Sequence, residues 1–117
     1  MSVVLYVEDH PPAQMLMQAI VGEMTQHRLV VAGTGAEART MAASLKPDLY
    51  IVDLDLPDGD GIALAQVLQP IHAAPVVLVS AYAESVKVSP VGGMVCAYLA
   101  KPLDPVDVAR TIERALA

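Results

Sequence analysis

Five short apolar segments constrain the fold of this 117-residue chain more than any other feature. They are rich in β-branched residues and alternate little with polar residues, which is typical of strands covered on both faces. The segments comprise residues 3–7, 29–32, 49–53, 76–80 and 97–100. Because sheets buried on both faces are usually parallel, the pattern predicts a central five-stranded parallel sheet.

Helical segments separate these strands, at residues 12–24, 36–45, 61–68 and 105–116. Apolar residues at three- and four-residue spacing predict the inward faces of the first and last helix, namely Leu16, Ala19 and Ile20, and Val106, Ala109, Ile112 and Leu116. Pro12 and Pro105 suit a first helical turn, and Asp104 is a candidate N-cap. The alternation of strands and helices predicts a doubly wound α/β domain.

A fourth helix is expected within residues 83–95, but the sequence there interrupts it. Pro90 follows Ser89, and Gly92 and Gly93 come shortly after. Each such residue costs a helix interior roughly 1–3 kcal/mol. We therefore expect an irregular fourth helix and, on that face of the domain, an altered partner surface.

Composition limits the classes of function. The formal net charge is −6, with three Lys and four Arg along the chain, so no basic stripe is available to neutralise a polynucleotide. The single Cys96 cannot form an internal disulfide, and no apolar run reaches the roughly 18–20 residues of a membrane span. We expect one cytoplasmic domain over residues 1–117, with no output domain, membrane partner or direct nucleic-acid binding.

Polar side chains stand where the predicted strands end. Glu8 and Asp9 follow the first strand, Asp53 ends the third, Ser80 ends the fourth and Lys101 follows the fifth. Ligands of open parallel sheets bind at the carboxyl ends of the strands, so these side chains are expected to converge there. Two carboxylates about 4 Å apart repel by roughly 4 kcal/mol at an effective dielectric constant of 20. The cluster therefore calls for a hard divalent cation, and Mg²⁺ suits a site with few carboxylates.

The same residues resemble a known family, the receiver domains of bacterial two-component response regulators. The resemblance covers nearly the whole chain and rests on four stretches in the expected order: Glu8-Asp9, the run from Val52 to Gly61 around Asp53, Val79-Ser80-Ala81, and Tyr98-Leu99-Ala100-Lys101-Pro102. It implies a flavodoxin-like (βα)5 fold with strand order 2-1-3-4-5. It further implies a cis peptide bond between Lys101 and Pro102.

The resemblance also implies a function. A histidine kinase or a histidine phosphotransfer protein would donate a phosphoryl group to Asp53, and an unidentified downstream protein would read the result. Asp9, Asp53 and the backbone carbonyl of Asp55 would bind Mg²⁺, with Glu8 acting through water. Lys101 and Ser80 would contact the phosphoryl oxygens, which fits the dominance of positioning and electrostatics in phosphoryl transfer.

Ser80 and Tyr98 would form the conformational switch. In the family, a displaced hydroxyl at the position of Ser80 leaves space that the aromatic residue at the position of Tyr98 fills. Such a chain would catalyse only its own phosphorylation and dephosphorylation and would not be an enzyme acting on a separate substrate.

Three alternatives remain open. Asp53-Leu54-Asp55 also resembles the nucleophile pair of haloacid-dehalogenase-type phosphatases, although that family places the pair after its first strand. A flavodoxin-like cofactor carrier is disfavoured because the loop from Glu8 to Pro12 is acidic and rich in proline, whereas a phosphate cradle needs glycine and free backbone N–H groups. A pseudo-receiver that serves as an unphosphorylated scaffold is the third.

Overall fold

A computed structural model describes residues 2–81 and 95–117 of the chain. One five-stranded sheet forms its centre, with the order β2-β1-β3-β6-β7, and every neighbouring pair is parallel. This is the predicted flavodoxin-like arrangement, because the five strands, counted along the chain, follow the order 2-1-3-4-5. The strands are β1 (Val3–Val7), β2 (Arg28–Ala32), β3 (Leu49–Asp53), β6 (Val76–Ser80) and β7 (Val95–Ala100).

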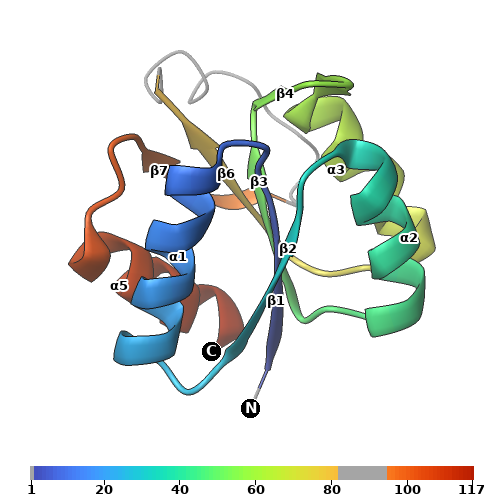
Figure 1. Cartoon of the computed structure of the whole chain (residues 1–117). Coiled ribbons are helices and arrows are strands. Elements are labelled where there is room, and N and C mark those ends of the chain that lie inside the picture. Colours follow the sequence, from blue (N-terminus) through green and yellow to red (C-terminus); the bar gives the residue numbers. More distant parts are fainter. Residues whose placement is uncertain (1, 82–94) are drawn as a thin grey trace.

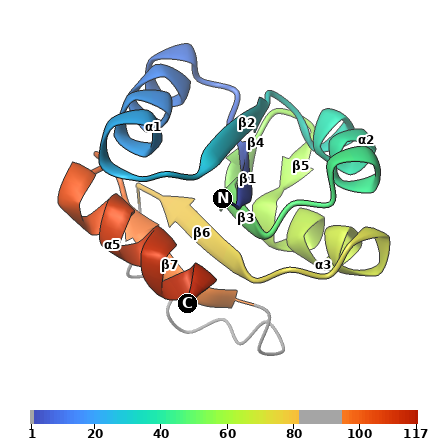
Figure 2. The same ribbon diagram turned by 90° about the horizontal axis from the view of Figure 1, so that it is seen from below.

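Helices cover both faces of the sheet (Figures 1 and 2). The helices α1 (Pro11–Met24) and α5 (Pro105–Leu116) lie on one face, and α2 (Gly35–Leu45) and α3 (Gly61–Ile71) lie on the other. Alternate residues of each strand enter one of two apolar clusters, so that Val4 and Tyr6 face α1 and α5, whereas Leu5 and Val7 face α2 and α3. The continuous apolar strands of the sequence are explained by this double cover.

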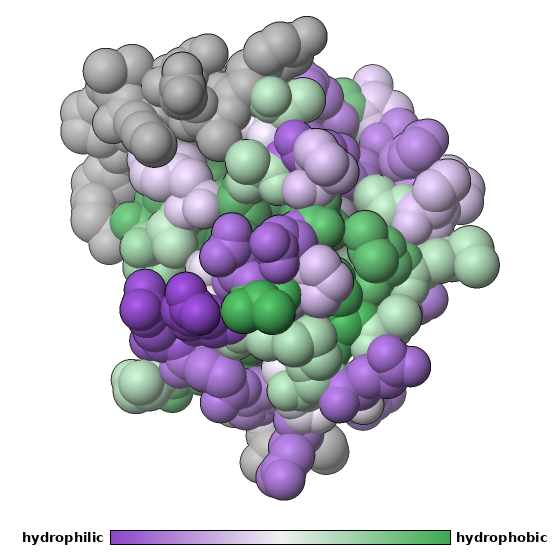
Figure 3. All heavy atoms as spheres, turned by 90° about the vertical axis from the view of Figure 1, so that its left-hand side faces the viewer, coloured by the Kyte–Doolittle hydropathy of each residue, from purple (hydrophilic) through white to green (hydrophobic). Residues whose placement is uncertain are grey.

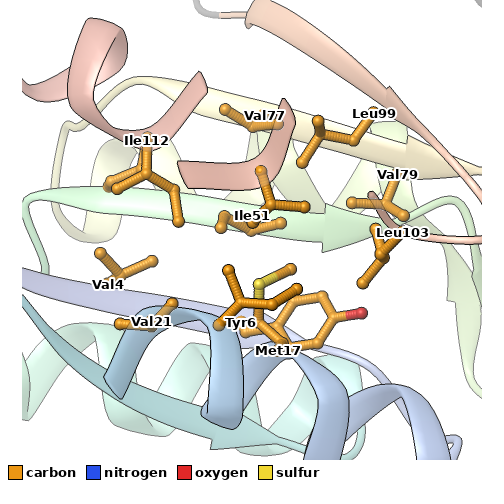
Figure 4. Close-up of a cluster of buried hydrophobic side chains, with 13 residues drawn as sticks. Val4, Tyr6, Met17, Val21, Ile51, Val77, Val79, Leu99, Leu103 and Ile112 are labelled. Atoms are coloured by element: carbon orange, nitrogen blue, oxygen red, sulfur yellow. The ribbon is translucent and has the colours of Figure 1, made fainter. Parts of the chain in front are cut away.

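The first cluster is almost wholly aliphatic (Figure 4). Met17 and Val21 of α1 and Ile112 of α5 pack over Ile51 and Val77 of the central strands. Its members are buried, as close packing of branched aliphatic side chains requires. The ring of Tyr6 joins this cluster, and Figure 4 shows its hydroxyl oxygen pointing toward the carboxyl ends of the strands.

The predicted inward faces of α1 and α5 were partly wrong. On α1 the buried residues are Met17, Ile20 and Val21, whereas Leu16 is 39% exposed and Ala19 is also exposed. On α5 the buried residues are Val108 and Ile112, and Val106 is 53% exposed. Spacing alone admits two neighbouring apolar stripes on each helix, and the sheet selects one of them.

The helix ends follow local chemistry. Proline occupies the first turn of α1 and of α5, as predicted. Asp104 caps α5, because its side chain accepts hydrogen bonds from the backbone N–H groups of Val106 and Asp107. Helix α3 runs three residues beyond its predicted end at residue 68 and contains Pro70. Pro70 has no backbone N–H to donate to the preceding turn, and α3 ends one residue after it.

A two-stranded hairpin between β3 and α3 was not predicted. It pairs β4 (Asp55–Leu56) with β5 (Gly59–Asp60) and carries Asp58 at its turn. The Asp58 carboxylate accepts hydrogen bonds from the backbone N–H groups of Gly35 (2.9 Å) and Ala36 (3.1 Å), at the N-terminus of α2. These two hydrogen bonds lower the pKa of Asp58. The hairpin is thereby fastened to the neighbouring helix.

Two further expectations concern the edges of the domain. The predicted irregular fourth helix falls almost entirely on residues 82–94, which lie outside the described residues, and Val95 already belongs to β7.

No helix within the described ranges has the length and apolar character needed to cross a bilayer. On the side formed by α1 and α5, hydrophilic residues surround smaller apolar areas (Figure 3).

Candidate phosphoacceptor site

The buried polar side chains of the described chain gather at one edge of the sheet. Among residues 2–81 and 95–117, tyrosines apart, they are Glu8, Asp53 and Ser80, with exposed fractions of 1%, 2% and 5%. Glu8 directly follows β1, and Asp53 and Ser80 end β3 and β6. These three strands are neighbours in a parallel sheet, so their carboxyl ends meet at the same edge. The structure thus brings together three of the residues that the sequence indicated.

Lys101 joins two of these side chains. Its Nζ atom lies 2.6 Å from Oδ2 of Asp53 and 2.8 Å from Oε1 of Glu8, and its side chain is 28% exposed. The Lys101 backbone N–H donates to the carbonyl of Ser80 at 3.0 Å, which ties the loop after β7 to the end of β6. The Lys101–Pro102 peptide bond is cis, as the family resemblance implied.

Hydrogen bonds in the loop after β3 fix Asp53. Its Oδ1 atom accepts a hydrogen bond of 2.9 Å from the backbone N–H of Asp55, while Oδ2 faces Lys101. Leu54 donates to the carbonyl of Val79 and accepts from the N–H of Gly61, both at 3.0 Å. A Cβ atom at Gly61 would collide with the carbonyl oxygen of Asp53, so only glycine permits this close approach. The Asp53 side chain therefore has one carboxylate oxygen on a backbone amide and one on an ammonium.

Glu8 is held by partners that the sequence analysis missed. Its Oε1 atom accepts from the hydroxyl of Tyr6 at 3.2 Å, and its Oε2 atom accepts from the backbone N–H of His10 at 3.4 Å. The Glu8 carbonyl accepts from Nε2 of Gln14 at 2.5 Å. Tyr6 and Glu8 are two residues apart at the end of a strand, a spacing that places side chains on the same side. That spacing was the available signal for the Tyr6 contact.

The local charges shift the pKa values of these groups. Burial, assisted by the neighbouring Asp53, raises the pKa of Glu8 above its usual value, although Lys101 opposes the shift. Burial alone would lower the pKa of Lys101, but the contacts with Asp53 and Glu8 outweigh it and the pKa is raised. Burial and the Glu8 carboxylate raise the pKa of Tyr6, so its hydroxyl remains a hydrogen-bond donor at neutral pH. Lys101 is therefore a lasting positive charge at this edge.

The remaining predicted residues are placed differently. The side chains of Asp9 and Asp55 are exposed, and Asp55 reaches Asp53 through its backbone N–H. Tyr98 of β7 is half-buried and packs against the cluster under α2 and α3. Across the two described ranges, no group of three or more His, Cys, Asp or Glu side chains is gathered closely enough to hold a metal ion by itself.

The charge balance and the donor atoms nevertheless fit a divalent cation. Among the described residues, the buried carboxylates of Glu8 and Asp53 both contact the ammonium of Lys101, so two negative charges share one counter-charge there. Burying an unpaired charge is costly, so a cation at this edge would stabilise the fold. The available donors are oxygens, and Mg²⁺ commonly uses one or two carboxylates and keeps several waters. A site with only one or two carboxylate ligands therefore suits Mg²⁺.

Comparisons with known proteins agree with the family resemblance of the sequence. The family model of the response regulator receiver domain matches residues 4–113. The positive alginate biosynthesis regulatory protein of Pseudomonas aeruginosa is 34% identical over 119 residues, covering 96% of this chain and 46% of that protein. The KDP operon transcriptional regulatory protein KdpE of Escherichia coli is 38% identical over 103 residues, covering 87% and 45%. The chain thus spans about half the length of these relatives.

Solved structures share the fold. A CheY-like receiver domain from Methanospirillum hungatei superposes with a TM-score of 0.88 at 22% identity, covering 99% of this chain and 94% of that one. The receiver domain of the sensor histidine kinase PA1611 from Pseudomonas aeruginosa gives 0.84 at 22% identity, covering 98% and 97%. That crystal structure holds a magnesium ion coordinated in its active-site cleft.

Proposed function

Since this chain belongs to the response regulator receiver domain family, we propose that it accepts a phosphoryl group on Asp53 from a phosphohistidine and thereby controls a partner protein. The donor would be a histidine kinase or a histidine phosphotransfer protein. The observation that carries the proposal is the buried Asp53 carboxylate at the end of β3, held between a backbone N–H and the ammonium of Lys101.

Asp53 acts as the nucleophile. One of its carboxylate oxygens forms a bond to phosphorus while the bond from phosphorus to the imidazole nitrogen breaks. The imidazole leaves with the bonding electron pair and takes a proton from solvent, and Asp53 becomes an acyl phosphate. Lys101 moves from Oδ2 of Asp53 to a phosphoryl oxygen, and its ammonium stabilises the charge that develops there. The chain thus acts on itself and not on a separate substrate.

Asp9, Asp53 and the carbonyl of Asp55 would hold Mg²⁺, with Glu8 acting through a water molecule. When bound, the ion neutralises negative charge on the transferring group. The residues of the chain orient Asp53 through the Asp55 N–H and position Lys101 through Glu8.

Ser80 and Tyr98 would carry the signal outward. Ser80 ends β6, which pairs with the strand β3 that carries Asp53. The Ser80 carbonyl accepts a hydrogen bond from the backbone N–H of Lys101. A hydrogen bond from the Ser80 hydroxyl to the phosphoryl group would shift the end of β6. Tyr98 of β7 is half-buried and pairs with Leu78 of β6. A shift of β6 would therefore alter the surroundings of the Tyr98 side chain. A bistable element is thereby coupled to one covalent charge.

The partners and location follow from the same function. We propose a downstream protein target rather than a nucleic acid for this segment, since the net charge of −6 opposes contact with polynucleotides. We propose a cytoplasmic location, because the single Cys96 suits a reducing compartment.

Acetyl phosphate tests the proposal. The protein is incubated with acetyl phosphate and Mg²⁺, and its intact mass is measured. We expect a gain of one phosphoryl group in the wild type and none in Asp53→Asn. The matched control is Asp107→Asn, the same change at an exposed position of α5, which should gain the group normally. A wild type that gains nothing, or an Asp53→Asn variant that gains the group, would overturn the proposal. Steady release of phosphate from monoesters would favour the dehalogenase-type phosphatase instead.

A further inference from the structure

Tyr6 carries a buried hydroxyl group. It lies on the central strand β1, and the residue is 0% exposed. Its ring packs with the aliphatic cluster between the sheet and the helices α1 and α5. An apolar side chain would fill that position without introducing a polar atom, and a buried hydroxyl without a partner costs about 1–3 kcal/mol. The hydroxyl therefore depends on the partner that it has.

That partner is a side chain of the phosphoacceptor site. The Tyr6 hydroxyl donates to Oε1 of Glu8 at 3.2 Å, and the same oxygen lies 2.8 Å from Nζ of Lys101. The other carboxylate oxygen of Glu8 accepts from the backbone N–H of His10. One neutral donor from the rigid core, one ammonium and one backbone amide thus fix the direction of the carboxylate.

We propose that Tyr6 is a positioning residue for magnesium binding: its hydroxyl fixes the orientation of Glu8 and so raises the affinity of the site for Mg²⁺. This inference rests on the proposed function, in which Glu8 acts on the ion through water. Groups that hydrogen-bond to the residues around a metal typically change its affinity 10–100-fold when they are removed. Because the Tyr6 contact is long and Glu8 keeps two other partners, we expect the low end, about 10-fold.

The chain offers a matched control in Tyr50. Tyr50 is also 0% exposed, lies on the neighbouring strand β3, and donates its hydroxyl to the carbonyl of His72 at 2.6 Å. Its ring belongs to the other apolar cluster, under α2 and α3. Tyr50→Phe therefore removes a buried phenolic hydrogen bond, as Tyr6→Phe does, without touching Glu8.

Calorimetric titration with MgCl₂ measures the dissociation constant in the two variants and the wild type. We expect Tyr6→Phe to raise the dissociation constant about 10-fold and Tyr50→Phe to leave it within 2-fold. In the acetyl phosphate reaction, Tyr6→Phe should raise the half-saturating Mg²⁺ concentration by the same factor, and the rate at saturating Mg²⁺ should stay close to wild type. Thermal unfolding by circular dichroism gives the fraction folded at the titration temperature.

The outcomes separate the two proposals. If the wild type binds Mg²⁺ and becomes phosphorylated, but Tyr6→Phe binds Mg²⁺ as tightly as the wild type, the inference about Tyr6 is wrong and the proposed function stands. If both variants lose the same affinity, the effect comes from general loosening of the core, and the inference is again wrong. A wild type that neither binds Mg²⁺ nor becomes phosphorylated would overturn both.

Discussion

Replacing Lys101 by Met is expected to destabilise the fold strongly when no divalent cation is present. Nζ of Lys101 contacts both Asp53 and Glu8, at 2.6 and 2.8 Å, and both carboxylates are almost fully buried. Met has nearly the same length as Lys but no charge, so the variant removes the ammonium and leaves two adjacent carboxylates in the interior. Breaking a buried ion pair by removing one partner is the damaging case, because the remaining charge loses its compensation.

The size of the effect follows from the contacts. At these separations a pair of unit charges attracts by roughly 6 kcal/mol at an effective dielectric constant of 20, and by about 1.5 kcal/mol in bulk water. Lys101 is 28% exposed, so solvent screening lowers the first figure. Removing one partner of a buried pair typically costs about 3–5 kcal/mol. We expect a loss of about 4 kcal/mol at neutral pH, which for a chain of this size lowers the melting temperature by about 16 °C.

Circular dichroism during heating, and during urea titration, measures this loss in buffer containing a chelator. Lys46→Met is the matched control, since Lys46 is exposed and the exchange should stay within about 0.5 kcal/mol of wild type. The double variant Lys101→Met with Asp53→Asn should regain most of the stability, because Glu8 then no longer faces a second buried carboxylate at Asp53. A Lys101→Met variant as stable as the control, or a double variant as unstable as the single one, would refute the reasoning.

Other substitutions test separate parts of the structure. Burial raises the pKa of Glu8 above 4.5, so the native state holds this proton more tightly than the unfolded chain. The stability of the wild type relative to Glu8→Gln should therefore fall as the pH rises from about 4.5 through the raised pKa, as urea titrations at several pH values would show. Gly61→Ala should cost about 2 kcal/mol or more in urea unfolding and slow phosphorylation by acetyl phosphate, because the new methyl group displaces the backbone of Asp53. Asp58→Ala should weaken hydrogen-exchange protection at the start of α2, whereas Asp58→Asn should retain part of it. The contribution of the Asp58 carboxylate should be present above pH 3.8 and lost as the pH falls through its lowered pKa.

The sheet could be predicted from the sequence because each strand is covered on both faces. Continuous apolar runs such as Val76–Ser80 have few other uses in a chain of this length, and all five residues of that strand are buried. Strand ends were less certain, and β7 begins two residues before its predicted start. The choice between Leu16 and Met17 on α1 could not be made, because both stripes are apolar and only the packing against the sheet separates them.

The site was accessible for a related reason. The ends of parallel strands in one sheet share its carboxyl edge, so topology places Glu8, Asp53 and Lys101 at the same edge. Topology does not give the direction of a side chain. The exposure of Asp9 and the hydrogen bond from Tyr6 to Glu8 depend on packing around each residue, which no spacing rule specifies.

The contrast between core and edge supports the functional interpretation. Apart from Tyr6 and Tyr50, the core of the described ranges is aliphatic, and its buried residues of other polar types, Glu8, Asp53 and Ser80, all stand at one end of three adjacent strands. A sequence selected for stability alone would place apolar residues there, since the desolvation of two buried carboxylates and an ammonium lowers the stability of the fold. Residues that break the rules of core packing without structural gain mark functional sites. The negative charge of these carboxylates would attract a cation. The Asp53 carboxylate would also be the nucleophile that accepts a phosphoryl group.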